Sequence, residues 1–422
     1  MQINNQDNNF FNKEIVFFLI LYLSLLVSFI FGENSTGGAI LDYLNQKQIS
    51  INFALDFKKT LINYDQLSTR HSPILIIILS YFEKISFSDF AIRLIHLHIC
   101  LLFPIIFYKC LDIKFKNSDK KIFLFLTSLI FLSPTFRSLS IWPDSRMLGI
   151  TVFTLSVYFY LKFIDEKKFI YIISNIFTCA ASAYLSPNFS VFSIFFFFMF
   201  VNIIGLKLNK IIPIIVLNLI LSFPAIYYIF ILDINFLNKS AAIGISEGQN
   251  IIFVNLFNSI LITFSIIFFY LLPFLLLKII KIKNFTNYKN IFISILIAII
   301  CSINFDYNFN YSGGGIFFKL SYFFFKNNYL FYFISFISIL IILPLLFQNK
   351  INLLIFFLIL LNNPQYTIYH KYFDPFFLIA FFMIFKFELD IDKIKINKKF
   401  LIIFFYFLCF LITSNLKLLW KI

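Results

Sequence analysis

The sequence carries few charged residues, and this scarcity excludes an ordinary soluble domain. Charged residues make up 13% of the chain, whereas soluble proteins average about 25%, and the mean hydropathy is +0.89. Apolar runs of about 17–25 residues, each long enough to cross a hydrocarbon core of about 30 Å, recur from end to end. The runs do not alternate between apolar and polar residues as barrel strands do. The composition therefore predicts an all-α, polytopic transmembrane helical bundle.

Cysteines and nucleotide-binding motifs are also scarce. The five cysteines lie within or at the edges of apolar runs, without metal-ligand spacing, so we expect them to be small packing residues. The glycine-rich stretch 312–315 lacks the spacing of a phosphate-binding loop, and no strand is expected before it. No small-residue cleavage site follows the first apolar run, which predicts an uncleaved first span rather than a signal peptide.

The apolar runs predict about 13 spans. They form a single transmembrane domain, residues 15–422, after a cytoplasmic tail, residues 1–14. The expected spans lie near residues 15–31, 90–109, 122–140, 147–163, 169–186, 189–206, 211–232, 251–278, 289–303, 329–347, 351–363, 374–387 and 399–416. Residues 73–87 are apolar but interrupted by polar side chains. We therefore expect an amphipathic interfacial helix there, within a non-cytoplasmic first loop of residues 32–89.

The basic residues behind the net charge of +15 indicate how the protein is oriented in the membrane. They do not indicate a nucleic-acid partner. Most lysines lie in short loops between apolar runs, the pattern of cytoplasmic loops in membrane proteins. If residues 73–87 do not cross the membrane, most basic clusters face the cytoplasm, whereas a crossing would turn them outward. We therefore expect the N-terminus inside, in the inner (plasma) membrane of a bacterium or in the endoplasmic reticulum membrane of a eukaryote.

Three acidic residues on the predicted outer face are candidates for catalysis. Glu33 lies just beyond the first span, where a carboxylate can deprotonate an acceptor hydroxyl beside the bilayer. Asp42 is the reserve candidate, in a short helix expected at the surface. Asp144 lies between two spans, where an acid needs water, a cation or another partner. The alternatives for Asp144 are an ion pair with Arg137 or Arg146, and a metal or phosphate site.

Basic residues on the same face are candidates for holding a phosphate: Arg70, His71, Arg146, His370 and Lys371. Arg70 and His71 precede an expected helix that begins at Ser72-Pro73, and helix N-termini favour phosphate. Arg146 shares a short turn with Asp144. Lys371 can neutralise a lipid phosphate as a point charge; the alternative is a lysine within an interfacial aromatic belt.

The order of these motifs resembles the GT-C superfamily of membrane glycosyltransferases, which includes protein O-mannosyltransferases and lipid A aminoarabinose transferases. Over residues 15–165 the resemblance rests on Gly32-Glu33, His71-Ser72-Pro73-Ile74, Phe90-Ala91-Ile92-Arg93-Leu94 and Asp144. A later stretch, Lys371-Tyr372-Phe373-Asp374-Pro375, is also similar to a family feature. The family's usual Asp-Glu pair is Gly32-Glu33 here, so the role of base passes to Glu33 or Asp42.

The resemblance implies inverting transfer of a sugar from a polyprenyl-phosphate donor to a lipid, glycan or protein acceptor on the non-cytoplasmic face. Glu33 would be the general base, and Asp144 would orient the acceptor or a divalent cation, Mg²⁺ or Mn²⁺. Arg70, His71 and Lys371 would hold the donor phosphate and stabilise its developing charge. The expected partners are the lipid-linked sugar, the acceptor and the membrane.

Two other functions stay open from the sequence. A flippase or transporter of lipid-linked oligosaccharides should place charges near the middle of its spans, and here the candidates lie in the outer half of the span near residues 90–109. A lipid-linked glycan polymerase should carry arginine-rich outer loops, and the arginines of this chain are isolated there.

Overall fold

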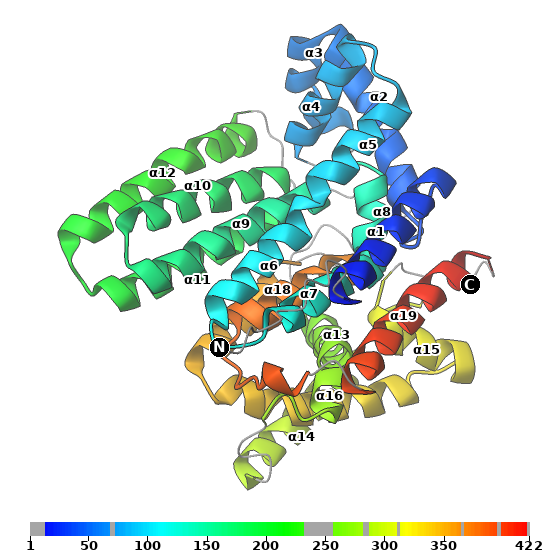
Figure 1. The fold of residues 1–422 in the computed structure, drawn as a ribbon, viewed down its shortest axis with the longest axis vertical. Coiled ribbons are helices and arrows are strands. Elements are labelled where there is room, and N and C mark those ends of the chain that lie inside the picture. Colours follow the sequence, from blue (N-terminus) through cyan, green and yellow to red (C-terminus); the bar gives the residue numbers. More distant parts are fainter. Residues whose placement is uncertain are drawn as a thin grey trace, which may run out of the picture.

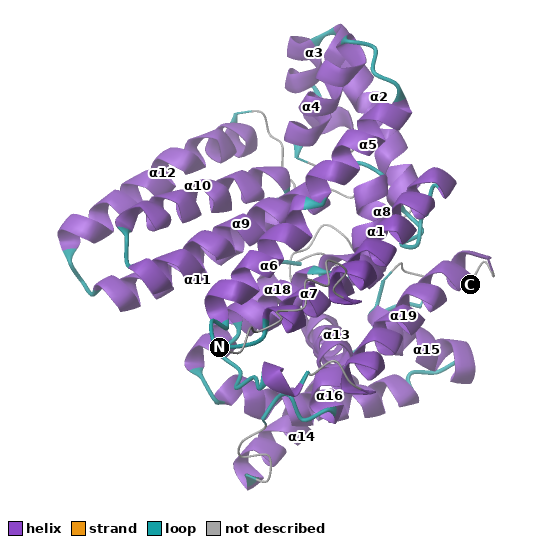
Figure 2. Ribbon diagram, in the orientation of Figure 1, coloured by secondary structure: helices purple, strands orange, loops and turns teal. Residues whose placement is uncertain are grey.

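The computed structural model describes residues 13–67, 72–231, 256–281, 287–309, 313–363, 367–394 and 398–419. Within these ranges the secondary structure is helical (Figures 1 and 2), apart from one isolated bridge between Ile280 and Leu389. The all-α prediction is confirmed for this part of the chain.

Seven helices of the described chain are long and apolar enough to cross a membrane. They are the continuous pair α5 (Asp89–Cys100) and α6 (Leu102–Lys114), α9 (Ser145–Glu166), η3 (Pro187–Val191) with α11 (Phe192–Ile204), α12 (Leu208–Phe230), α13 (Leu256–Leu276), α16 (Tyr329–Phe347) and α19 (Lys398–Leu419). An eighth span is formed if α7 (Lys120–Ser128), η2 (Leu129–Leu132) and α8 (Pro134–Ile141) cross together, with a bend of 67°. The chain is therefore a helical membrane protein.

The predicted number of about 13 spans is not confirmed. Several expected spans are shorter apolar helices: α1 (Lys13–Phe31, apolar over Ile15–Phe31), α10 (Phe169–Leu185), α14 (Tyr288–Ile303) and α17 (Lys350–Leu361). A further apolar helix, α15 (Gly315–Phe325), lies in a stretch that we expected to be a loop. Hydropathy identifies apolar side chains, but it does not separate a helix that crosses the bilayer from one buried among its neighbours.

The expected span 374–387 is the largest departure. The structure has only α18 (Phe376–Ile379) followed by the π-helical turn η5 (Ala380–Ile384), and then an extended segment leading to η6 (Ile391–Lys393). Every side chain from Phe376 to Phe385 is buried. This stretch is apolar because the protein surrounds it, which a sequence pattern cannot distinguish from surrounding lipid.

The first loop folds into a separate group of helices at one end of the molecule, at the top of Figure 1. It contains α2 (Ala39–Leu55), α3 (Phe57–Ile62), η1 (Tyr64–Leu67) and α4 (Pro73–Lys84). Helix α4 packs against α2, and its 12 residues extend about 18 Å, less than a bilayer core. Ser72, just before the first residue of α4, makes no side-chain capping bond, and its hydroxyl donates to Tyr184 O of α10.

Four helix ends meet beneath this group of helices. Arg93 of α5 donates from Nε to Ile141 O (3.1 Å), at the end of α8, and from Nη2 to Phe29 O (3.3 Å), near the end of α1. Its guanidinium also stacks over the Trp142 ring, 3.6 Å from the centroid, in the short connection to α9. We call this end of the bundle the loop end.

Candidate functional site

A short segment, residues 368–374, crosses the loop end, and we call it the strap. It contains the single turn η4 (His370–Tyr372). Arg146, in the first turn of α9, donates from Nε to Lys371 O (3.0 Å) and from Nη2 to Tyr372 O (2.7 Å). The same guanidinium lies 4.1 Å from the centroid of the Tyr372 ring. The two hydrogen bonds and the ring contact fix the backbone of the strap to α9.

The C-terminal end of the strap is bound by residues between η2 and α8 and in the first turn of α8. Asp374 is buried, and its Oδ2 accepts hydrogen bonds from Ser133 Oγ (2.6 Å) and Thr135 N (3.1 Å). Ser133 Oγ in turn accepts from Phe136 N (2.9 Å) and caps α8. The first N–H groups of a helix have no partners within the helix, and a carboxylate near them also complements the helix dipole. Asp374 therefore stabilises the start of α8 and fixes the strap there.

The N-terminal end of the strap lies against the glycine-rich stretch. Gly314 N donates to Ile368 O (2.8 Å). Gly313 has a φ of +95°, and a Cβ at this position would lie 2.3 Å from Ile368 O. Only glycine allows this conformation and this approach without strain. Gly313 and Gly314 therefore support the strap.

Lys371 and Asp42 join the strap to the first loop. Lys371 Nζ lies 2.9 Å from Asp42 Oδ2, and the side chains are 24% and 32% exposed. Burial lowers the pKa of Lys371, but the negative charges of Asp42 and Asp144, together with Tyr372, outweigh this effect and hold the pKa above that of a free lysine. Lys371 is therefore a permanent cation that remains partly open to solvent.

Asp144 caps helix α9. Its Oδ1 accepts a hydrogen bond from Arg146 N (2.7 Å), and its side chain is buried. In the described part of the chain it forms no ion pair with Arg137 or Arg146, the two partners considered from the sequence. Arg146 connects it to the strap, because its N donates to Asp144 and its Nε donates to Lys371 O.

Glu33 forms a buried ion pair. Its Oε2 lies 2.8 Å from Arg137 Nε, with side-chain exposures of 8% and 5%. The other donors of Arg137 reach Ser24 Oγ and O, Ser28 Oγ and Phe131 O. Trp142 Nε1 donates to Glu33 O (3.0 Å). The Glu33 carboxylate is thus held rigidly, and its buried Oε1 has no hydrogen-bond partner among the described residues.

His370 contributes to the strap as a neutral residue. Its Nε2 lies 3.0 Å from the Tyr270 hydroxyl of α13, and its ring packs against Phe269 and Phe410. Burial lowers the pKa of His370 to about 3. It therefore carries no positive charge for a phosphate at neutral pH, and its contacts attach the strap to α13.

Two predicted phosphate ligands, Arg70 and His71, lie outside the described residues. The remaining candidates come together at the loop end from the first loop, the start of α9 and the strap. Arg137 was expected from the sequence to be a possible partner of Asp144, and in the structure it pairs with Glu33 instead. One feature of the sequence indicates such a pair: Arg137 lies inside an apolar run, where an arginine requires a counter-charge.

No cation site is formed by side chains of the described residues. No three His, Cys, Asp or Glu side chains lie close enough together to hold a metal ion among them. Among the described residues, the candidate ligand Asp144 is therefore not part of a set of three such side chains, whereas Mg²⁺ and Mn²⁺ prefer several oxygen ligands.

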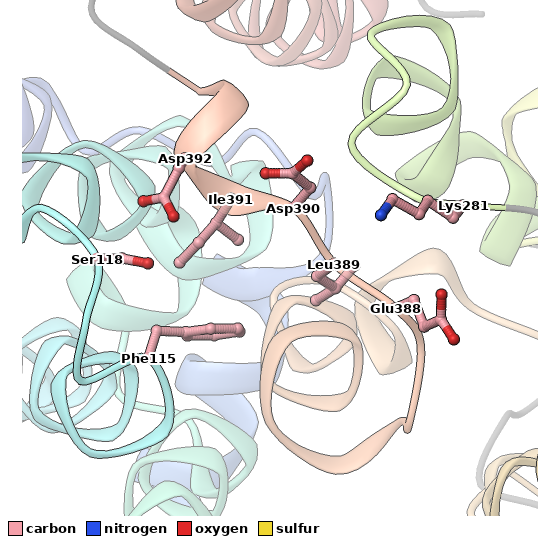
Figure 3. A pocket seen from close by; sticks show the side chains of 8 residues that line it. All are labelled: Phe115, Ser118, Lys281, Glu388, Leu389, Asp390, Ile391 and Asp392. Carbon is pink, nitrogen blue, oxygen red and sulfur yellow. The ribbon is translucent and has the colours of Figure 1, made fainter.

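A cavity of about 370 Å³ opens at the opposite end of the bundle. It is lined by Phe115, Ser118, Lys281 and residues 388–392. Figure 3 shows that the carboxylates of Glu388, Asp390 and Asp392 point in different directions instead of converging on one point. Asp390 is also paired with Lys393, at 3.2 Å. This cavity is therefore a weaker candidate than the loop end.

Comparisons of the chain with protein-family models, with curated proteins and with solved structures give no match.

Proposed function

We propose that this protein is a membrane glycosyltransferase that takes a sugar from a polyprenyl-phosphate donor at the loop end. The observation that carries the proposal is the Asp42–Lys371 pair, beside the start of α9, where Arg146 binds the Lys371 carbonyl. A partly exposed cation and a carboxylate thus lie together at one end of an apolar bundle. This combination suits a substrate with an anionic head and a hydrocarbon chain.

In the proposed reaction Lys371 binds the donor phosphate. The bond between sugar C1 and the phosphate oxygen breaks, and its electron pair stays on the phosphate, where Lys371 stabilises the charge. The acceptor hydroxyl oxygen forms the new bond to C1. Its proton passes to a carboxylate that acts as general base.

Asp42 is the best candidate for this base. The Glu33 carboxylate is shielded and neutralised by Arg137, and only its buried Oε1 has no partner. Asp144 is buried and accepts a hydrogen bond from Arg146 N. Asp42 is the most exposed of the three acids, and its carboxylate is paired only with Lys371 among the described residues. We therefore assign the proton transfer to Asp42, and we assign Glu33 to positioning the loop end.

Arg146 and His370 are positioning residues in this proposal. Arg146 is engaged with the Lys371 and Tyr372 carbonyls, and His370 is neutral at physiological pH. Each holds the strap in place, so each acts on the donor through Lys371.

An assay with purified protein and radiolabelled polyprenyl-phosphate sugars tests the proposal. The protein is reconstituted in vesicles, and both release of polyprenyl phosphate and movement of the intact donor across the bilayer are followed. We expect sugar transfer that Lys371→Met abolishes. Donor movement across the bilayer without cleavage would favour a flippase and contradict the proposal.

A further inference from the structure

Helix α2 is joined to the strap and to α5 by two ion pairs. Asp42, in its first turn, pairs with Lys371 of the strap, and Lys47 pairs with Asp89 at the start of α5. Tyr43 lies between them and donates to Asp89 Oδ1 (3.2 Å). The two ion pairs have similar chemistry, but only one of them includes the proposed phosphate-binding cation.

The two partners of the Asp42–Lys371 pair are fixed to different extents. The Lys371 carbonyl is bound by Arg146, so the lysine stays in place when its side chain changes partner. Among the described residues, the Asp42 carboxylate accepts a hydrogen bond from Lys371 alone. Loss of this contact would leave Asp42 as a free carboxylate beside the phosphate-binding cation.

We propose that the Asp42–Lys371 ion pair is a latch that the donor phosphate opens, which releases Asp42 to act as the base. This inference rests on the proposed function. The phosphate and the Asp42 carboxylate are both anions that need the same ammonium group, so binding of the phosphate replaces Asp42.

The exposure of the pair makes this exchange feasible. Both side chains are partly exposed, and ion pairs of this kind are held weakly. Both side chains of the Glu33–Arg137 pair are buried. Separating them would leave uncompensated charges inside the protein. At the loop end, the Asp42–Lys371 pair can therefore exchange its partner for a phosphate, whereas the Glu33–Arg137 pair has a fixed structural role. The latch also makes the base available only after the donor has bound.

Binding of polyprenyl phosphate, without a sugar, to the full-length protein tests the latch. Trp142 lies at the loop end, and the chain contains two tryptophans. A Trp420→Phe background therefore makes Trp142 the only tryptophan reporter of binding. We expect Asp42→Asn to bind polyprenyl phosphate about two- to fivefold more tightly, because no carboxylate competes for Lys371. Lys371→Met should abolish binding.

Lys47→Met is the matched control, because it breaks the other ion pair of α2 and leaves Lys371 untouched. We expect its affinity to equal that of the parent protein. If Asp42→Asn and a second variant, Asp42→Ser, both bind no more tightly than the parent, the latch is wrong while the proposed function stands. If the parent protein itself does not bind polyprenyl phosphate, the proposed function is wrong. Tighter binding by Lys47→Met as well would also overturn the latch, because loosening of α2 would then be the cause.

Discussion

Arg137 is the most completely engaged side chain at the loop end. A guanidinium has five N–H donors, and Arg137 makes five hydrogen bonds, one of them to Glu33 Oε2. The others reach serine hydroxyls and carbonyls of α1 and η2. This residue therefore fixes the end of the first helix against the bent span, whatever chemistry takes place beside it.

Arg137→Leu should strongly destabilise the fold. The substitution leaves Glu33 buried without a counter-charge, which costs about 3–5 kcal/mol. Lys47→Met removes a partly exposed pair and should cost at most about 1 kcal/mol. Thermal unfolding of both variants in detergent measures the difference, and equal midpoints would contradict the fixed role of the Glu33–Arg137 pair.

His370 should make stability depend on pH. Burial lowers its folded-state pKa to about 3 from an ordinary value of 6.5, so the unfolded chain binds a proton between these values while the folded protein does not. Stability is therefore complete above about pH 6.5 and falls as the pH decreases towards 3. The expected loss is up to about 2 kcal/mol at pH 5.

Unfolding midpoints at pH 7.5 and pH 5 measure this effect. His370→Gln should reduce the difference between the two midpoints. His98→Gln, which changes an exposed histidine, should leave it unchanged. The same pH dependence in wild type and His370→Gln would show that other groups are responsible.

Among the elements, the strap and the bent span support each other. Ser133 and Pro134 divide the expected span 122–140 into two helices that meet at 67°, and Asp374 binds the new helix start. The proline at the first helical position and the serine before it were visible signals of a helix start. The carboxylate that completes the site comes from residue 374, and no local pattern indicates that contact.

The limits of prediction from the sequence follow from this arrangement. Helical character, the acids and the cations were recognisable because composition and local order determine them. The Asp42–Lys371 pair joins residues that are far apart in the chain, and its formation depends on how the tertiary structure brings the start of α2 to the strap. The sequence predicts spans where the structure has short helices, because buried phenylalanines and lipid-facing phenylalanines give the same pattern.

Gly313→Ala should displace the strap. The new Cβ would lie 2.3 Å from Ile368 O in a backbone with φ of +95°. Gly205→Ala is the matched control, because Gly205 also has a positive φ, +75°, but a Cβ there meets no atom within 4 Å. Gly205→Ala should cost about 1–3 kcal/mol of stability and leave polyprenyl phosphate binding unchanged.

The expected result for Gly313→Ala is a larger loss of stability together with at least tenfold weaker binding of polyprenyl phosphate. The displacement would move Lys371, and small misplacements of binding groups have large effects. Unfolding and Trp142 fluorescence measure the two quantities. Unchanged binding in Gly313→Ala would contradict the role of the strap in positioning Lys371.

At the scale of the whole molecule, the loop end and the end with the acidic cavity lie at opposite ends of the pair α5–α6. The bias of lysines predicts that the loop end faces away from the cytoplasm. Single cysteines at Gln48 on α2 and at Asn117 after α6, both exposed, test this in a background without native cysteines. We expect an impermeant reagent to label Gln48→Cys from outside the cell and not Asn117→Cys. The reverse pattern would contradict the orientation.

The most direct test of the account is the rate of sugar transfer by Asp42→Asn compared with Lys47→Met. Both variants break one ion pair between α2 and the rest of the protein, so both loosen this helix. A general base contributes about 10²–10⁴-fold to the rate. We predict that Asp42→Asn lowers transfer from a polyprenyl-phosphate sugar by at least about 100-fold, while Lys47→Met stays close to the wild-type rate. Wild-type transfer by Asp42→Asn would contradict the account.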